Sequence, residues 1–194
     1  MEDKKLNSQE SIDLISRMIR NTQNNLQKNA GSYSIFWGYV TLVVSLADYF
    51  LLTATGDYRV HFVWFAIPVI GFPLSFILRR RLGPVSVRTF VDVVTYKLWI
   101  PLAVALCTFP FVTGSRALTV VLMLISLGIA QTGLIVKYPV FTVAGFVGLA
   151  AALALLFIGG PGQILVFAFF SVVVLIIPGH ILNHKAAREH VQRA

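Results

Sequence analysis

Residues 117–158 read ALTVVLMLISLGIAQTGLIVKYPVFTVAGFVGLAAALALLFI, and Lys137 is the one charged residue among them. A helix needs about 20 predominantly apolar residues to cross the hydrocarbon of a bilayer. This stretch holds two such lengths, 117–136 and 138–158, and Tyr138-Pro139 supplies a break between them. The stretch therefore predicts two transmembrane helices joined by a very short turn, which must run antiparallel.

The remainder of the chain has the same apolar character. Of its 194 residues, 57% are hydrophobic and 12% are charged, whereas an ordinary soluble domain has about 45 to 50% and about 25%. Nineteen of the 24 charged residues also lie in three segments, at 1–32, at 79–97 and from His184 onward, so the charges cannot form the polar shell of a soluble domain. A membrane protein is the class that remains.

Six apolar stretches have the length of a transmembrane helix, at 33–54, 60–78, 98–114, 117–136, 138–158 and 163–183. The sequence therefore predicts an all-α fold, a polytopic membrane helix bundle with six transmembrane helices. We expect three parts: a cytoplasmic amphipathic helix at 1–32, the transmembrane domain at 33–183 and a basic cytoplasmic tail at 184–194.

The start of the third helix fits two positions. Its apolar stretch begins at Leu98, but an apolar stripe with helical spacing precedes it, at Val87, Val91 and Val94. A single helix from about Ser86 to Phe109 would place its first turns in the cytoplasmic interface.

The orientation follows from the Lys and Arg residues. With the N-terminus in the cytoplasm, fourteen of them lie inside and two, Arg59 and Arg116, lie outside. This is a strong positive-inside bias. The formal net charge of +8 therefore reflects topology. Direct nucleic-acid binding is not expected, since the densest run, Arg79-Arg80-Arg81, is explained as a headgroup anchor.

The N-terminal segment has the pattern of an amphipathic helix. Ile12, Ile15, Ile19 and Leu26 recur on one face, opposite a mixed polar face. One interpretation is a helix that lies on the inner leaflet or packs on the cytoplasmic end of the bundle. The other is a docking helix for a soluble cytoplasmic regulator or for a second copy of the chain.

Asp48 is the one ionisable residue well inside a predicted span. It lies six residues from the outer end of the first span, or about 9 Å below that boundary, where a carboxylate costs at least about 2 to 3 kcal/mol unless it is paired, protonated or in water. It ends a face of small and polar residues that should point into the bundle: Ser34, Gly38, Thr41, Ser45 and Asp48.

Partners at the depth of Asp48 are His61, Arg59 and Arg116. The candidate intramembrane polar site therefore consists of Asp48, Ser45, Thr41 and His61. Two interpretations stay open, because the carboxylate could serve helix packing alone or could form a ligand, proton or ion site.

The sequence lacks the residue combinations that known intramembrane enzymes use for catalysis. Intramembrane proteases, phosphatidyl transferases and phosphatases need a Ser-His pair, an aspartate cluster or an Arg-Lys-His set, and none is present. Cys107 is the single cysteine, and no Cys and His spacing resembles a structural zinc site. We therefore expect no catalysis, no metal and no cofactor.

A seam of small residues in the fifth span, Ala144, Gly145, Gly148 and Ala152, predicts close packing against another helix.

Four motifs give the chain a resemblance to a group of small, uncharacterised bacterial membrane proteins. They are Glu10-Ser-Ile-Asp-Leu-Ile-Ser-Arg-Met-Ile19, Phe36-Trp-Gly-Tyr39, Ser45-Leu-Ala-Asp-Tyr-Phe-Leu-Leu52 and Val91-Asp-Val-Val-Thr-Tyr-Lys-Leu-Trp99. The resemblance covers roughly the first half of the chain. It implies a bacterial cytoplasmic (inner) membrane and frequent encoding beside a winged-helix regulator, and it brings no known activity.

We expect a membrane protein without catalysis that acts as a sensory or regulatory partner through its cytoplasmic face. The alternative is a small-solute or ion transporter or channel that uses the polar face of the first span. A water-filled cavity that reaches Asp48 would favour transport, and a closed, dry bundle would favour regulation.

Overall fold

The structure is a computed structural model that describes residues 8–81 and 90–191, and every regular element in these two ranges is a helix. The predicted all-α class is therefore confirmed for this part of the chain. The elements in chain order are α1 (Ser8–Thr55), η1 (Tyr58–Phe65), α2 (Ala66–Arg81), α3 (Phe90–Thr113), η2 (Gly114–Arg116), α4 (Ala117–Ile135), α5 (Pro139–Leu155), α6 (Gly162–Ser171), η3 (Val172–Ile176) and α7 (Ile177–Val191).

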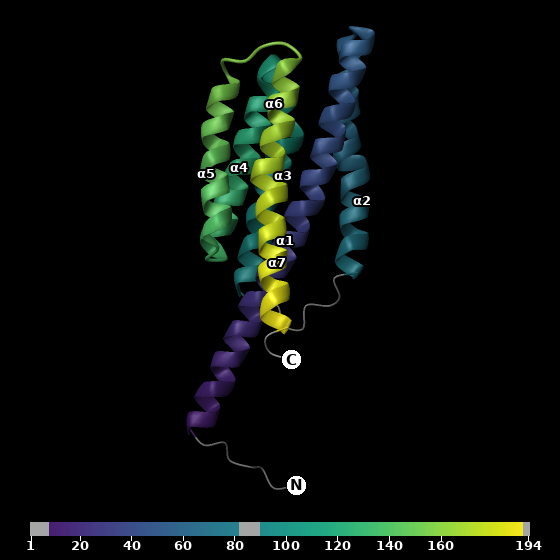
Figure 1. Ribbon diagram of the computed structural model, residues 1–194. Coiled ribbons are helices and arrows are strands. Elements are labelled where there is room, and N and C mark those ends of the chain that lie inside the picture. Colours follow the sequence, from purple (N-terminus) through teal and green to yellow (C-terminus); the bar gives the residue numbers. More distant parts are fainter. Residues whose placement is uncertain (1–7, 82–89, 192–194) are drawn as a thin grey trace.

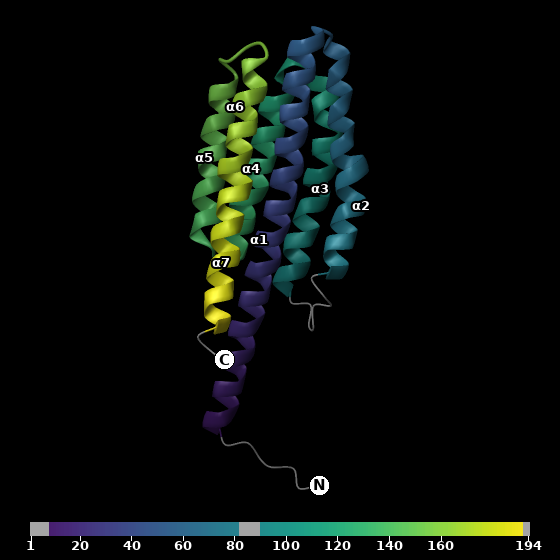
Figure 2. The same cartoon turned by 45° about the vertical axis from the view of Figure 1, so that its right-hand side comes forward.

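Four helical stretches are long and apolar enough to cross a membrane, namely Ala30–Thr55, Tyr58–Leu78, Val93–Ile135 and Gly162–Lys185. The third of these folds back at η2, so that α3 and α4 lie side by side (Figures 1 and 2). α5 is also apolar but shorter, with 17 residues. α3 is already helical at Phe90, which excludes a helix start at Leu98. The earlier predicted start, Ser86, lies outside the described residues.

Side chains from α4, α5 and the last helical stretch form the core. One cluster includes Ile129, Phe141 and Leu182, and a second includes Leu122 and Phe167. α1 packs against α6, η3 and α7, and α2 lies at the edge of the bundle beside α1 (Figure 2).

The predicted close approach of α5 to another helix is confirmed. A Cβ atom on Gly145 would collide with the backbone of Ala130, and one on Gly148 would collide with the Ser126 side chain. Ala152 is also buried. The small residues of α5 thus let its backbone lie close against α4.

α1 is a single uninterrupted helix of 48 residues, about 72 Å long at about 1.5 Å per residue. The sequence predicted a separate amphipathic helix that ends near residue 32. The structure differs, because no proline or turn separates the N-terminal segment, residues 8–29 (the leader), from the apolar span that begins at Ala30. The N-terminal part of α1, purple in Figures 1 and 2, continues beyond the bundle rather than turning along its end.

Much of the outer surface is apolar. On α2, the large apolar residues that are exposed are Val69, Ile70, Phe72, Leu74, Phe76 and Ile77. A soluble monomer rarely exposes an apolar surface of this kind, whereas lipid tails solvate it well.

The predicted sixth span contains a π-helical turn, η3, between α6 and α7. Pro178 follows it, and proline lacks the N–H that would pair with the carbonyl of Val174 and clashes with that carbonyl in a regular α-helix. The backbone N–H of Ile177 instead bonds to the carbonyl of Val172, five residues back. The wide turn thus accommodates Pro178 without ending the helix.

Candidate functional site

Asp48 lies on α1, two turns before that helix ends, and its side chain is completely buried. The face that it shares with Ser34, Gly38, Thr41 and Ser45 is buried along its length, as the spacing predicts. A carboxylate in such a place needs hydrogen-bond donors, and the structure supplies them from the segment that follows α1.

That segment, η1, is a 3-10 helix whose start and end have local causes. Gly56, with a φ of +67°, ends α1 in a conformation that suits glycine. Asp57 then caps η1, because its side chain accepts a hydrogen bond from the backbone N–H of Arg59. A 3-10 helix has about 3 residues per turn, so side chains at i and i+3 are eclipsed. His61 and Trp64 therefore point in the same direction, toward Asp48.

Both rings donate hydrogen bonds to the Asp48 carboxylate. Nδ1 of His61 lies 2.9 Å from Oδ1 and 3.0 Å from Oδ2, and Nε1 of Trp64 lies 2.9 Å from Oδ2. Trp Nε1–H can only donate, so Oδ2 acts as an acceptor. Each carboxylate oxygen thus has an N–H donor, which is the arrangement that stabilises an ionised carboxylate away from water.

The cluster of Asp48, His61 and Trp64 has a buried side and an exposed side. The Asp48 side chain is 0% exposed, whereas the His61 side chain is 42% exposed. A protonated His61 forms an ion pair with Asp48, and a neutral His61 still donates through Nδ1–H in one tautomer. The exposed ring of His61 therefore lets the surroundings act on a carboxylate that they cannot reach directly.

Ser45 of the predicted polar site, and Ser34 farther along the same face, have hydrogen-bond partners other than Asp48. The Ser45 hydroxyl donates to the carbonyl of Thr41 on its own helix, at 2.7 Å. The Ser34 hydroxyl donates to the carbonyl of Leu175 in η3, at 2.8 Å. The polar face thus has one part around Asp48 and another where α1 meets the π-helical turn.

Of the three partners predicted for Asp48, only His61 contacts it. Arg59 uses its backbone N–H to cap η1, and its side chain is exposed. Arg116 is exposed at the start of α4. The third member, Trp64, was not predicted from the sequence. Its position three residues after His61 was a usable signal, because a buried indole usually needs a hydrogen-bond acceptor.

The predicted docking face belongs to the first turns of α1. Ile12 is 57% exposed. The side chains of Ile15, Ile19 and Leu26 lie outside the part that the structure describes. The leader thus presents at least one large apolar side chain outside the bundle.

Comparison with protein families, curated proteins and solved structures finds no match to this chain. The site itself must therefore carry any assignment of function.

Proposed function

We propose that this chain is a six-span protein of the bacterial inner membrane that transmits the state of an outer polar cluster to a soluble cytoplasmic partner. The observation that carries the proposal is α1, since one helix bears Asp48 near one end and the amphipathic leader at the other. A helix is stiff over this length, so a shift or rotation at Asp48 moves the leader as well.

The full burial of Asp48 favours regulation over transport. A transported ion or proton needs a path of water or polar groups on both sides of the site. Here the Asp48 side chain has no exposure, and its oxygens are occupied by His61 and Trp64. The cluster suits an input element better than a transport site.

The places of the charged residues support the proposed topology. Arg59 and Arg116 lie in η1 and η2, at the turns that join α1 to α2 and α3 to α4. The other end of the bundle holds the start of α1 and the end of α7 (Figure 1). With the N-terminus in the cytoplasm, this arrangement obeys the positive-inside rule.

The topology is tested with single cysteines in a Cys107→Ser background. Cysteine at Gln9 should react with a membrane-impermeant maleimide only after the cells are opened, whereas cysteine at Asp57 should react in spheroplasts. The reverse pattern, or reaction of both in spheroplasts, would overturn the proposed orientation.

The partner is tested by affinity capture from native membranes of the source bacterium. The full chain should recover a soluble protein, which the resemblance suggests is a winged-helix regulator. Deletion of residues 1–28 and the substitution Ile12→Glu should each abolish recovery. Gln9→Glu, which adds the same charge at an exposed position of the leader, is the matched control and should leave recovery unchanged.

Transmission along α1 is tested by two further variants. Asn24→Pro breaks the helix six residues before the apolar span, since proline in a helix interior removes a hydrogen bond. Asp48→Asn changes the input cluster. Both should alter partner recovery, whereas Arg59→Gln, at an exposed outer position, should not. Recovery that is unaffected by Asp48→Asn would reject the relay.

A further inference from the structure

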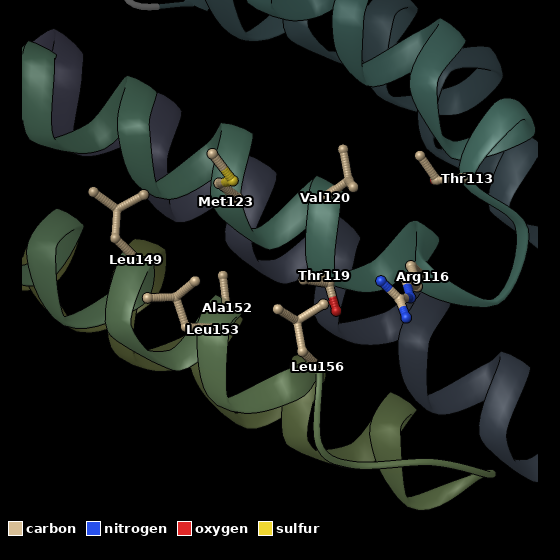
Figure 3. Close-up of a pocket in the computed structure, with 9 residues that line it drawn as sticks. All are labelled: Thr113, Arg116, Thr119, Val120, Met123, Leu149, Ala152, Leu153 and Leu156. Carbon is tan, nitrogen blue, oxygen red and sulfur yellow. The ribbon is translucent and has the colours of Figure 1, made fainter.

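A pocket of about 510 Å³ lies between α4 and α5, near η2 (Figure 3). This volume falls within the range of about 300 to 1,000 Å³ that is typical of ligand sites. Its lining is mostly apolar and includes Val120, Met123, Leu149 and Leu153. Leu153 is 61% exposed and Met123 is 49% exposed, so the pocket opens to the outside of the bundle.

Arg116 lies at one end of this pocket. It is exposed, and within the described ranges no acidic side chain pairs with it. It also occupies the N-cap position of α4, where the helix dipole adds a partial positive charge. An anion at this point would be favoured by both charges.

Thr119 supplies an independent sign of a missing ligand. The residue is 6% exposed, and its hydroxyl oxygen is buried without a hydrogen-bond partner in the part of the chain that the structure describes. Thr132, on the same helix, donates to the carbonyl four residues before it, that of Gly128. Thr119 makes no such bond, and both Thr119 and Arg116 line the pocket (Figure 3).

We propose that this pocket binds one anionic phospholipid of the outer leaflet. The Arg116 guanidinium and the Thr119 hydroxyl hold a phosphate oxygen, and one acyl chain lies along the apolar walls of α4 and α5. A guanidinium fork matches phosphate geometry, and the apolar walls need an acyl chain that a free phosphate lacks. The lipid enters sideways from the bilayer through the open face. The proposal rests on the membrane-spanning arrangement proposed above, but it does not depend on the relay through α1.

The test begins with the protein extracted from membranes that have been washed with carbonate. Loss of the protein in the wash would contradict the membrane assignment itself, and with it this site. The retained protein is purified in a mild detergent, incubated with equal amounts of phosphatidylglycerol and phosphatidylcholine, and examined by native mass spectrometry. We expect one retained phosphatidylglycerol per chain.

Arg116→Gln should lower phosphatidylglycerol retention at least tenfold, because it removes charge-assisted hydrogen bonds to the phosphate. Arg116→Lys, which keeps the charge, should retain part of it. Arg59→Gln is the matched control, since Arg59 is the other outer arginine, and it should leave retention unchanged. Equal retention of the two phospholipids, or no effect of Arg116→Gln, would overturn the proposal.

Thr119→Val separates a ligand site from a packing defect. Under the proposal it weakens phosphatidylglycerol retention severalfold and reduces the increase in Tm that added phosphatidylglycerol produces. If the hydroxyl merely lacked a partner, the same change would raise the Tm without lipid and leave retention unaltered. Recovery of only detergent, or of a free fatty acid in place of phospholipid, would also reject the assignment.

Discussion

Replacing Trp64 with phenylalanine should destabilise the protein more than the same replacement at either of the other tryptophans. The Trp64 indole donates to the buried carboxylate of Asp48 at 2.9 Å. A hydrogen bond to a charged group contributes about 1.5 to 3 kcal/mol. We therefore expect Trp64→Phe to lower the free energy of unfolding by about that amount, in addition to the packing lost with the smaller ring.

The other two tryptophans provide matched controls. Trp99 donates to the hydroxyl of Thr132 at 3.1 Å, a neutral bond, and neutral bonds between membrane helices average about 0.6 kcal/mol. Trp37 packs edge-on against Phe72, and the indole N–H has no acceptor within residues 8–81 and 90–191. The expected order of destabilisation is therefore Trp64, then Trp99, then Trp37.

A double-mutant cycle with Asp48→Asn isolates the hydrogen bond from the packing term. With an amide at position 48 the bond to Trp64 becomes neutral, so Trp64→Phe should cost about 1 kcal/mol less in that background. Unfolding in detergent by added dodecyl sulfate, followed by circular dichroism at a helix band, measures each free energy. Additivity within about 0.5 kcal/mol, or a cost at Trp64 no larger than at Trp37, would refute the assigned role of the indole.

Two further predictions concern contacts between helices, and a third concerns the surroundings of Cys107. Gly148→Ala should destabilise by about 1 to 3 kcal/mol, because its Cβ would collide with a serine of α4, whereas Gly159→Ala, in open space, should have little effect in the same unfolding assay. Ser34→Ala should cost about 0.6 to 1.5 kcal/mol through the lost bond to the carbonyl of Leu175, and no loss would show that this bond contributes nothing. Cys107, exposed on α3, should resist a charged maleimide in intact membranes and react once the protein is denatured, because a charged reagent does not enter the hydrocarbon of a bilayer. Rapid labelling before denaturation would place Cys107 in water.

The all-α class and the faces on which helices pack could be predicted from local sequence patterns. The small residues Gly145 and Gly148 predicted close packing of α5, since helical periodicity places them on one face. The burial of the face that ends at Asp48 followed in the same way. These features depend on the spacing of residues within one helix, which can be read from the sequence.

The composition of the polar cluster was less accessible. His61 was one of three predicted partners of Asp48, and depth alone could not choose among them. The choice depends on η1 being a 3-10 helix, because this geometry directs His61 and Trp64 to the same side. Whether these eight residues form an α-helix or a 3-10 helix depends on how they pack against the rest of the chain.

The sequence pattern also did not show where a helix continues and where its regular geometry is interrupted. The change from polar to apolar residues near Ala30 resembles a domain boundary, yet α1 continues through this position without interruption. A change of solvent along a helix need not interrupt its hydrogen bonds. In the last helical stretch the opposite occurs, since a uniformly apolar segment contains a π-helical turn before Pro178.

Composition and periodicity therefore suffice for the apolar character of this chain, its all-α class and the buried faces of α1 and α5, because each of these depends on residue types and on spacing within one helix. The tertiary structure decides which distant groups meet: Trp64 with Asp48, Ser34 with η3, and Arg116 with Leu153 and Leu156 of α5 around one pocket. Such meetings depend on turn geometry and on the relative placement of helices, and the free energies that set them arise only when segments far apart in the chain pack together.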